Sequence, residues 1–264
     1  MRIAILGCGR MGGWLGRCLQ DKHELIGCEP DATRASASGI HKLWQAPEEL
    51  QAFAPQLLVN CVPLGQTIEA FAGIAEQLPA DCILADLASV KTGLAEYYQN
   101  CGHAFVSTHP MFGPTHSDES DLQGQNAVII TESGSAGRLF FLELYSGLGI
   151  RVFEESFAQH DQTVAYSLST PFASSLVFAA CMQRLNAPGT NFRRHLETAR
   201  GLLSEDDTLL SEILFNPHTA RQLELIGSQL SYLTHIIRDR DSEEMAKYLG
   251  RLRQNIGLET AADS

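Results

Sequence analysis

The chain has 264 residues, of which 44% are apolar, and its formal net charge is −12. This length is sufficient for a large core and for two domains of ordinary size. The negative charge argues against nonspecific binding to nucleic acid or to anionic membranes, since both need a positive field. An anionic substrate would therefore have to be captured by a few locally placed cations.

The cysteine pattern favours free thiols. Seven cysteines are present, an odd number, and no pair is spaced as CxxC. A reducing compartment explains this better than disulfides or zinc, so we expect no metal site. The apolar start, residues 1–6, is too short for a signal peptide, and we expect no stretch able to span a membrane. These features together predict a cytoplasmic protein.

A glycine motif follows the first predicted strand. Residues 2–6 are apolar, Gly7-Cys-Gly-Arg-Met-Gly12 comes next, and a helical pattern begins within it. This order of strand, glycine loop and helix is the context that a dinucleotide fingerprint requires. The first glycine permits a tight turn, the second lets a pyrophosphate approach, and the third lets helix and strand pack closely. The predicted cofactor-binding residues of this loop are Gly7, Gly9, Arg10, Met11 and Gly12.

The second predicted strand, residues 24–28, ends at Glu29. A carboxylate at this position accepts hydrogen bonds from the adenosine ribose and repels a 2′-phosphate, which favours NAD over NADP. Asp31 is an alternative ribose ligand. Arg34 argues in the opposite direction, because a nearby arginine can accommodate a phosphate.

Further strands alternate with helices. The third predicted strand, residues 56–62, is closed by Pro63, and we expect Val62 and Pro63 beside the nicotinamide ribose. Later predicted strands span 81–85, 104–107, 126–130 and 150–153, with helices between most of them. This alternation predicts an α/β fold with a Rossmann-type, doubly wound, mostly parallel sheet over residues 1–154.

Two polar segments follow neighbouring strands of that sheet. They are Asp86-Leu-Ala-Ser-Val-Lys91 and Ser107-Thr-His-Pro-Met-Phe-Gly-Pro114. Ligands lie beyond the carboxyl ends of such strands, so we expect Ser89, Lys91 and His109 to converge near the nicotinamide. An imidazole beside a hydride acceptor suits oxidation of a carbon that bears a hydroxyl. Alternatively, Asp86 or Ser89 caps the following helix, and the second segment is only a Pro/Gly turn.

The strand pattern stops after Phe153, and residues 155–264 read as an all-α domain. A long helical segment, residues 159–185, is expected to kink at Pro171. Four more helices are predicted, and the tail from residue 259 is expected to fray. The broad apolar faces suit a dimer interface, although a monomeric helical bundle would account for them equally well. The four predicted helices span 191–203, 208–215, 217–238 and 242–257.

The motifs GCGRMG, DLASVK and HPMFGP occur together in this order. The chain resembles the prephenate dehydrogenases of tyrosine biosynthesis, the TyrA family, and most of all the dehydrogenase part of the bifunctional chorismate mutase–prephenate dehydrogenase. No chorismate mutase helices precede the glycine motif, so only dehydrogenase activity is expected. The resemblance implies NAD-dependent oxidative decarboxylation of prephenate to 4-hydroxyphenylpyruvate. It also implies a homodimer formed by the helical domain, which closes the cleft.

The same resemblance suggests roles for individual residues. His109 would accept the substrate's hydroxyl proton, Ser89 would orient that pair, and Lys91 would help to place cofactor or substrate. His160, followed by Asp161, matches a His-Asp pair that borders the active site, although the pair would equally suit a helix N-cap region.

An arginine on the helix at 191–203 would bind the substrate's ring carboxylate, as arginine suits bidentate carboxylate recognition. Arg200 is the best match, with Arg193 or Arg194 second, and a solvated helix face is the alternative for all three. Many family members carry a histidine where this chain has residues 169–172. Its absence leaves arogenate open as the substrate. A nucleotide-sensing regulatory protein with the same fold is a more distant alternative.

Overall fold

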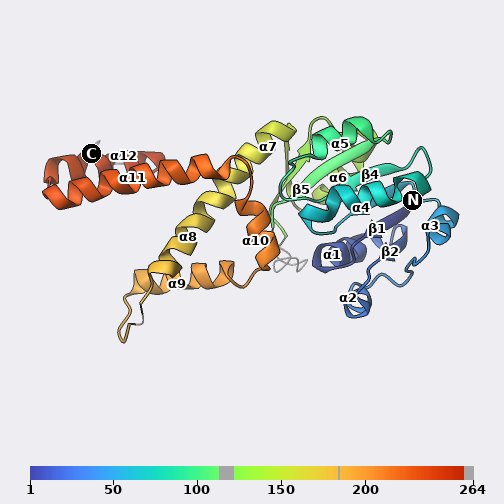
Figure 1. Ribbon diagram of the computed structural model, residues 1–264, viewed down its shortest axis with the longest axis horizontal. Coiled ribbons are helices and arrows are strands. Elements are labelled where there is room, and N and C mark those ends of the chain that lie inside the picture. The colour runs from blue at the N-terminus through green and yellow to red at the C-terminus, as the bar shows by residue number, and fades with distance from the viewer. Residues whose placement is uncertain (113–121, 184, 259–264) are drawn as a thin grey trace. The chain divides into compact units, whose positions relative to one another are not determined.

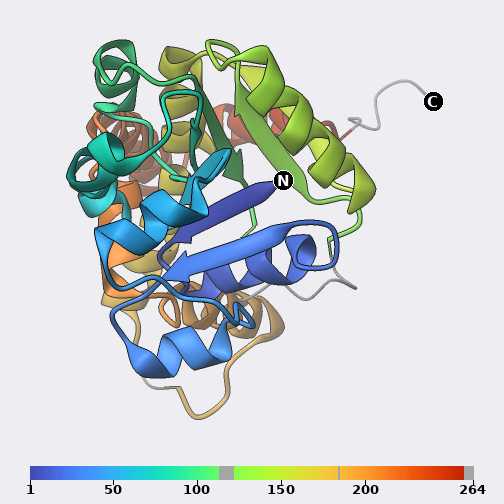
Figure 2. The ribbon, with the colours of Figure 1, turned by 90° about the vertical axis from the view of Figure 1, so that its right-hand side faces the viewer.

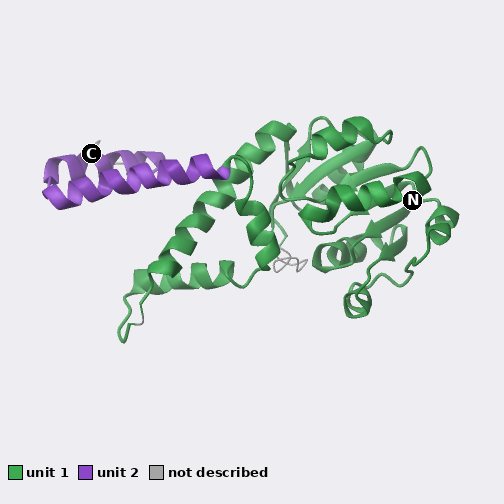
Figure 3. Ribbon diagram, in the orientation of Figure 1, with its two compact units in different colours: residues 1–218 green, residues 219–264 purple. Residues whose placement is uncertain are grey.

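The computed structural model describes residues 1–112, 122–183 and 185–258 (Figure 1). Gly113 and Pro114 of the predicted turn, and the tail expected to fray, lie outside the described residues. The chain forms two compact units, Met1–His218 and Thr219–Ser264 (Figure 3). The strands do end at Glu155, close to the predicted boundary. The compact units divide elsewhere, however, because the first four helices after the sheet belong to the same unit as the sheet.

In the described part of the chain, seven strands form one sheet in the order β2-β1-β3-β4-β5-β6-β7. Neighbouring strands run parallel except β5 and β6, which are antiparallel. The predicted mostly parallel sheet is therefore confirmed. The strand order reverses between β1 and β3, the position where open α/β sheets bind their ligands. The strands are β1 (Arg2–Leu6), β2 (Glu24–Cys28), β3 (Leu57–Asn60), β4 (Ile83–Asp86), β5 (Phe105–Pro110), β6 (Asn126–Ile130) and β7 (Arg151–Glu155).

Helices cover both faces of the sheet (Figures 1 and 2). Along β1, Ile3 and Ile5 pack on one face with Trp14 of α1, whereas Ala4 packs on the other face with Phe71 of α4. This is the period-two alternation of a strand buried on both sides. The doubly wound arrangement is thus confirmed. Its helices are α1 (Arg10–Leu19), α2 (Ala32–Ala37), α3 (Pro47–Phe53), α4 (Thr67–Ile74), α5 (Leu94–Asn100) and α6 (Ser135–Gly147).

The predicted long helix after the sheet is two helices joined by a π-helical segment, Ala165–Ser169. Pro171 lies in the first turn of the second helix, directly after the π-helical segment, and the kink expected at this proline stays a prediction. Phe178 and Phe192 then join that helix to the next, with ring centroids 5.3 Å apart. The helices of this region are α7 (Phe157–Val164), α8 (Thr170–Cys181), α9 (Thr190–Leu202) and α10 (Asp207–Leu214).

We expected no stretch long and apolar enough to span a membrane, and judged by length and composition alone that expectation was wrong. The helical run Phe157–Cys181 is long and apolar enough to cross a bilayer, and 22% of its most apolar window is buried in the structure. A single helix of this kind is weak evidence of a membrane span. Side chains from this run also line the cavity described below.

The second compact unit consists of two helices, α11 (Thr219–Asp239) and α12 (Ser242–Asn255), within its described residues. Arg240 takes a left-handed conformation with φ 53° between them, and Asp241 then caps α12 by accepting from the Glu244 N–H. The rings of Tyr232 and Tyr248 hold the two helices together with centroids 5.5 Å apart.

Candidate active site

The glycine loop after β1 has the geometry that a dinucleotide needs. Gly7 has φ +83°, and a Cβ there would meet the backbone of Cys61 and Val62 at 3.0 Å. A Cβ on Gly12 would overlap the Gly7 carbonyl oxygen at 2.0 Å, so the helix can approach the strand only with glycine. At Gly9 nothing lies within 4 Å of a built Cβ, which leaves room for a pyrophosphate. The residues present therefore fit a dinucleotide.

The turn after β3 closes the other side of the topological switch point. Asn60 ends β3, and its side-chain oxygen accepts from the Val62 N–H at 3.1 Å. This fixes the backbone that leads into Pro63. Of the predicted nicotinamide-side residues, Val62 therefore lies beside the glycine loop, with its backbone N 3.0 Å from a Cβ built on Gly7, and Pro63 follows it in the chain.

The predicted ribose ligands at the end of β2 are largely engaged with their own turn. Glu29 Oε1 accepts from the Asp31 N–H at 3.1 Å. Asp31 Oδ1 caps α2 by accepting from the N–H groups of Thr33 and Arg34 at 2.8 and 3.0 Å. These backbone hydrogen bonds lower the pKa of Asp31. Asp31 is thus primarily a helix cap, as its residue type favours.

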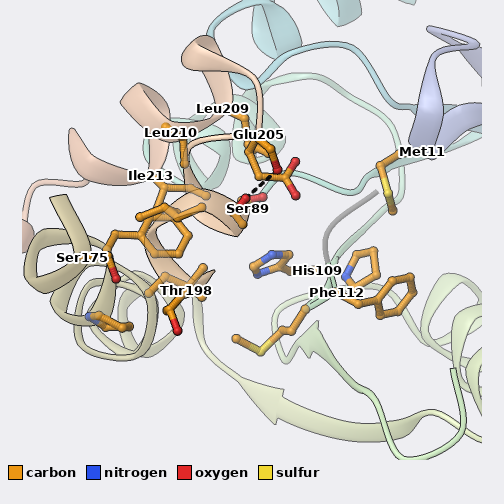
Figure 4. A pocket seen from close by; sticks show the side chains of 18 of the residues that line it. Met11, Ser89, His109, Phe112, Ser175, Thr198, Glu205, Leu209, Leu210 and Ile213 are labelled. Atoms are coloured by element: carbon orange, nitrogen blue, oxygen red, sulfur yellow. Dashed lines mark hydrogen bonds between the residues drawn. The ribbon is translucent and has the colours of Figure 1, made fainter. Parts of the chain in front are cut away.

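A cavity of about 580 Å³ opens beside the glycine loop (Figure 4). Ser89 and His109 project into it from the ends of neighbouring strands, and Met11 lines it from the glycine loop. Most of the remaining lining side chains are apolar and come from the helices after the sheet. The cavity is lined by Met11, Leu87, Ser89, His109, Pro110, Met111, Phe112, Leu168, Pro171, Phe172, Ser175, Thr198, Gly201, Leu202, Ser204, Glu205, Leu209, Leu210 and Ile213.

His109 is the first member of a buried chain of three polar side chains. Its Nδ1 lies 3.0 Å from Nε2 of His160, and Nδ1 of His160 lies 3.2 Å from Oδ1 of Asp161. Asp161 is anchored in turn, because Oδ1 accepts from the Lys91 N–H at 2.7 Å and Oδ2 accepts from the Thr92 hydroxyl at 3.1 Å. The chain thus runs from the cavity wall into the junction of β4 and α7.

The hydrogen bonds assign the protons along this chain. A carboxylate can only accept, so the proton on His160 belongs on Nδ1, facing Asp161. His160 Nε2 then accepts, and His109 must donate through Nδ1. Nε2 of His109 therefore carries a lone pair and is the ring nitrogen available to the cavity. This tautomer is the one that a general base requires.

Burial keeps both histidines neutral. Desolvation is the main reason that the pKa of His109 is well below its usual range, and the proximity of His160 and of the Lys91 ammonium lowers it further. Desolvation also lowers the pKa of His160, although Asp161 opposes it. Burial alone would raise the pKa of Asp161, but hydrogen bonds from His160 and the Lys91 N–H outweigh it, and the pKa is lowered. The chain at neutral pH is therefore two neutral imidazoles ending in a carboxylate.

Lys91 is not among the residues that line the cavity. The prediction that it contacts cofactor or substrate is therefore wrong for this structure. Its ammonium is fully buried, 2.6 Å from Asp86 Oδ1 and 2.8 Å from the carbonyl oxygen of Thr108. Tyr98 donates its hydroxyl to the other oxygen of Asp86 at 2.8 Å. Asp86 is accordingly no helix cap, since the N-cap of α5 is Gly93. The pair instead ties β4 to β5 directly beneath His109.

The three arginines predicted to bind a carboxylate do not line the cavity. Arg193, Arg194 and Arg200 are all exposed, and α9 turns Thr198, Gly201 and Leu202 toward the cavity instead. A helix presents residues three and four apart on one face, and Arg200 falls outside that stripe. No lysine or arginine is among the described residues that line the cavity, so the predicted role of Arg200 is not realised in this structure.

Sequence reasoning placed His160 near the site but did not predict its contact. The N-cap alternative was wrong, because Ser156 caps α7 in a capping box with Gln159, and His160 and Asp161 lie buried inside the helix. Asn216 was missed altogether. Its side-chain amide donates to the backbone carbonyl of Asp161 at 2.8 Å, which fixes that turn of α7. An Asn-Pro pair between helices gave no sign of this role.

The fold and the site together define a class of protein. A glycine loop for a dinucleotide adjoins a cavity with a neutral histidine base, an arrangement typical of nicotinamide-dependent dehydrogenases. Residues 15–148 match the family model described as prephenate dehydrogenase, nucleotide-binding domain. The chain therefore belongs to the prephenate dehydrogenase family, and this confirms the resemblance seen in its motifs.

Individual relatives agree with this assignment. A T-protein from Enterobacter agglomerans is 27% identical over 182 residues, covering 66% of this chain and 48% of its own length. A probable arogenate/prephenate dehydrogenase from Methanocaldococcus jannaschii is 20% identical over 218 residues, covering 77% of this chain and 48% of its own length. The chain thus spans about half the length of the curated relatives it matches.

Solved structures share the fold. Prephenate dehydrogenase from A. aeolicus, in complex with hydroxyphenyl propionate and NAD+, superposes with a TM-score of 0.83 at 18% identity and covers 98% of each chain. Synechocystis arogenate dehydrogenase gives a TM-score of 0.76 at 20% identity, covering 97% of this chain and 99% of its own.

Proposed function

We propose that this protein oxidatively decarboxylates prephenate to 4-hydroxyphenylpyruvate with NAD as hydride acceptor. The observation that carries the proposal is the hydrogen-bonded chain His109–His160–Asp161, which presents an unprotonated Nε2 to a cavity beside the glycine loop. Membership of the prephenate dehydrogenase family supports the reaction type. The NAD+ complex of the A. aeolicus enzyme, which shares the fold, supports the cofactor.

NAD, when bound, accepts the hydride that leaves the ring carbon bearing the hydroxyl. His109 accepts the hydroxyl proton at Nε2, and His160 and Asp161 stabilise the charge that develops on its ring. Ser89 lines the same cavity and orients the hydroxyl. The ring carboxylate leaves as carbon dioxide, and its bonding electrons complete the aromatic ring. Aromatisation supplies driving force, so the residues need mainly to position the substrate and to remove one proton.

The cavity would bind the substrate mainly through apolar contact and neutral donors. Leu168, Phe172 and Leu210 offer surfaces for a six-membered ring, whereas Ser89 and Thr198 offer hydroxyls to its polar groups. Hydrogen bonds from neutral donors to a carboxylate are weaker than those from arginine. We therefore expect modest affinity for a dianionic substrate.

Arogenate is a second candidate substrate, and Glu205 favours it. Glu205 places a carboxylate in the cavity lining, where it would attract the ammonium that distinguishes arogenate from prephenate. Prephenate carries a neutral keto group in place of that ammonium and gains no such attraction.

One assay separates these possibilities. The protein is mixed with NAD and either prephenate or arogenate, and the absorbance of the reduced cofactor is followed. A kcat/KM higher for prephenate supports the proposal, and a higher value for arogenate replaces the substrate but keeps the chemistry. Binding of NAD without turnover of either substrate would instead favour a nucleotide-sensing protein.

We also infer that the protein forms a homodimer through its helical region. Large exposed apolar side chains on α11 support this, among them Leu225, Leu230 and Ile237. Analytical ultracentrifugation at micromolar concentration tests it, and a single monomeric species would contradict it.

A further inference from the structure

Three arginines line a second cavity, of about 220 Å³, on the outer side of the glycine loop. Arg10 and Arg17 come from α1, and Arg34 comes from α2. No acidic residue is among the described residues that line it. In a chain with 19 basic and 31 acidic residues, such a cluster stands against the overall charge. Its lining residues are Cys8, Gly9, Arg10, Gly13, Arg17, Arg34, Ala37 and Ser38.

The acidic residues at the end of β2 do not line this cavity, and Asp31 lies close enough to Arg34 for the two charges to interact. Glu29 lines a different cavity, together with Pro30 and His41, and its carboxylate accepts from the Asp31 N–H. The Asp31 carboxylate caps α2. Neither carboxylate expected at the end of β2 is therefore among the described residues that line the arginine cavity.

The position of this cavity matches one part of a dinucleotide. Gly9 lies where the pyrophosphate approaches the helix, and the segment from β2 into α2 adjoins the adenosine ribose in this fold. Arg34 on α2 and Arg17, two turns into α1, thus lie on the ribose side of the pyrophosphate. The 2′-hydroxyl of that ribose is the group that carries the extra phosphate in NADP.

We propose that Arg10, Arg17 and Arg34 form a binding site for the 2′-phosphate of NADP, so that the protein binds NADP in addition to NAD. Guanidinium groups bind phosphate through paired, charge-assisted hydrogen bonds. Three arginines together suit a phosphate dianion, because a single exposed arginine binds such a group only weakly. The inference rests on the nucleotide-binding part of the proposed function and is independent of the substrate.

The competing explanation is that the same arginines bind only the pyrophosphate, which NAD and NADP share. Arg10 opens α1 and is close enough to the loop to serve that purpose. The two explanations differ in one measurable respect. A site for the 2′-phosphate discriminates between adenosine 2′,5′-bisphosphate and 5′-AMP, whereas a pyrophosphate site does not.

The test is isothermal titration calorimetry of the 264-residue chain with these two nucleotides. The wild-type protein is expected to bind adenosine 2′,5′-bisphosphate at least about tenfold more tightly than 5′-AMP. Arg34→Ala and Arg17→Ala are each expected to lower this ratio at least about threefold, while the affinity for 5′-AMP changes by less than about twofold. Lys22→Ala removes one exposed positive charge just beyond α1 and is the matched control, with an unchanged ratio.

Equal affinity of the wild-type protein for the two nucleotides would overturn the inference. Parallel losses for both nucleotides in Arg34→Ala and Arg17→Ala would overturn it as well, in favour of a pyrophosphate site. Arg34→Lys, which keeps the charge but loses the paired donors, is expected to recover part of the ratio. Thermal unfolding of each variant shows that it is folded.

The outcome is separable from that of the proposed function. Neither nucleotide carries nicotinamide, so selective binding of the bisphosphate stands even if prephenate and arogenate are not oxidised. Turnover with NAD combined with equal nucleotide binding would remove this inference alone.

Discussion

The two cavities on either side of the glycine loop differ in their electrostatics. The larger one is mainly apolar, and the histidine that lines it is buried, with a lowered pKa and a chain of hydrogen bonds that sets which ring nitrogen carries the proton. The smaller one is lined by three arginines, which need no partner to stay charged. Burial tunes a group that must exchange a proton, whereas accessible permanent charge suits a group that must only bind. Substitutions in the buried chain should therefore alter chemistry, and those on exposed arginines should alter affinity at most.

The largest effect is expected from His109→Asn. Asparagine cannot accept the substrate proton, so kcat should fall about 10²–10⁴-fold with little change in NAD affinity. Steady-state kinetics and cofactor titration check this, with His41→Asn, an exposed histidine outside the cavity, as control. Near-normal turnover would remove His109 from the mechanism.

Asp161→Asn should cost about 10²–10³-fold in kcat. An amide can donate to His160 and reverse the tautomers along the chain, which would leave His109 Nε2 protonated. A merely structural role would lower stability without moving the pH profile of kcat/KM. Loss of the carboxylate should instead shift the acidic limb to lower pH. Gln162→Ala, on the exposed side of α7, is the control.

Lys91→Met should act on stability first. It leaves the carboxylate of Asp86 buried without its cation, which costs about 3–5 kcal/mol of unfolding free energy. Urea denaturation measures this loss. A loss below about 1 kcal/mol would show that Lys91 has a different partner in solution.

The pH dependence of both activity and stability follows from the lowered histidine pKa values. The acidic limb of kcat/KM should have its midpoint below pH 6.5, because His109 stays unprotonated until its own lowered pKa is reached. In the unfolded chain both histidines titrate near 6.5, so below that pH the unfolded state binds more protons. Stability contributed by keeping His109 and His160 neutral is therefore full above pH 6.5 and declines as the pH falls below it. A midpoint above 7 would contradict the buried assignment.

The smallest effect is expected from Arg200→Ala. Its side chain is exposed and does not line the cavity, so the KM for prephenate should change by less than about threefold. Arg193→Ala should behave in the same way. An increase of more than about tenfold for Arg200→Ala would mean that α9 rotates when substrate binds.

The sequence by itself determined the features that depend on neighbouring residues. The strand periodicity, the glycine loop and the start of α12 near Ser242 follow from side-chain alternation, backbone freedom and the Asp241 cap, all of which act over a few residues. The two polar strand ends were predictable as well, since parallel strands end at one edge of a sheet.

Only the tertiary structure decided which polar groups meet. His109 and His160 are 51 residues apart, and Asp161 binds the backbone of a residue 70 positions away. Nothing local distinguishes a lysine that faces a cavity from one that is buried against Asp86, or an arginine on the inner face of α9 from one on the outer. Those outcomes depend on how the helices after the sheet pack against one another and against the sheet. The free energy of such packing is shared among many distant contacts, so no short stretch of sequence records it.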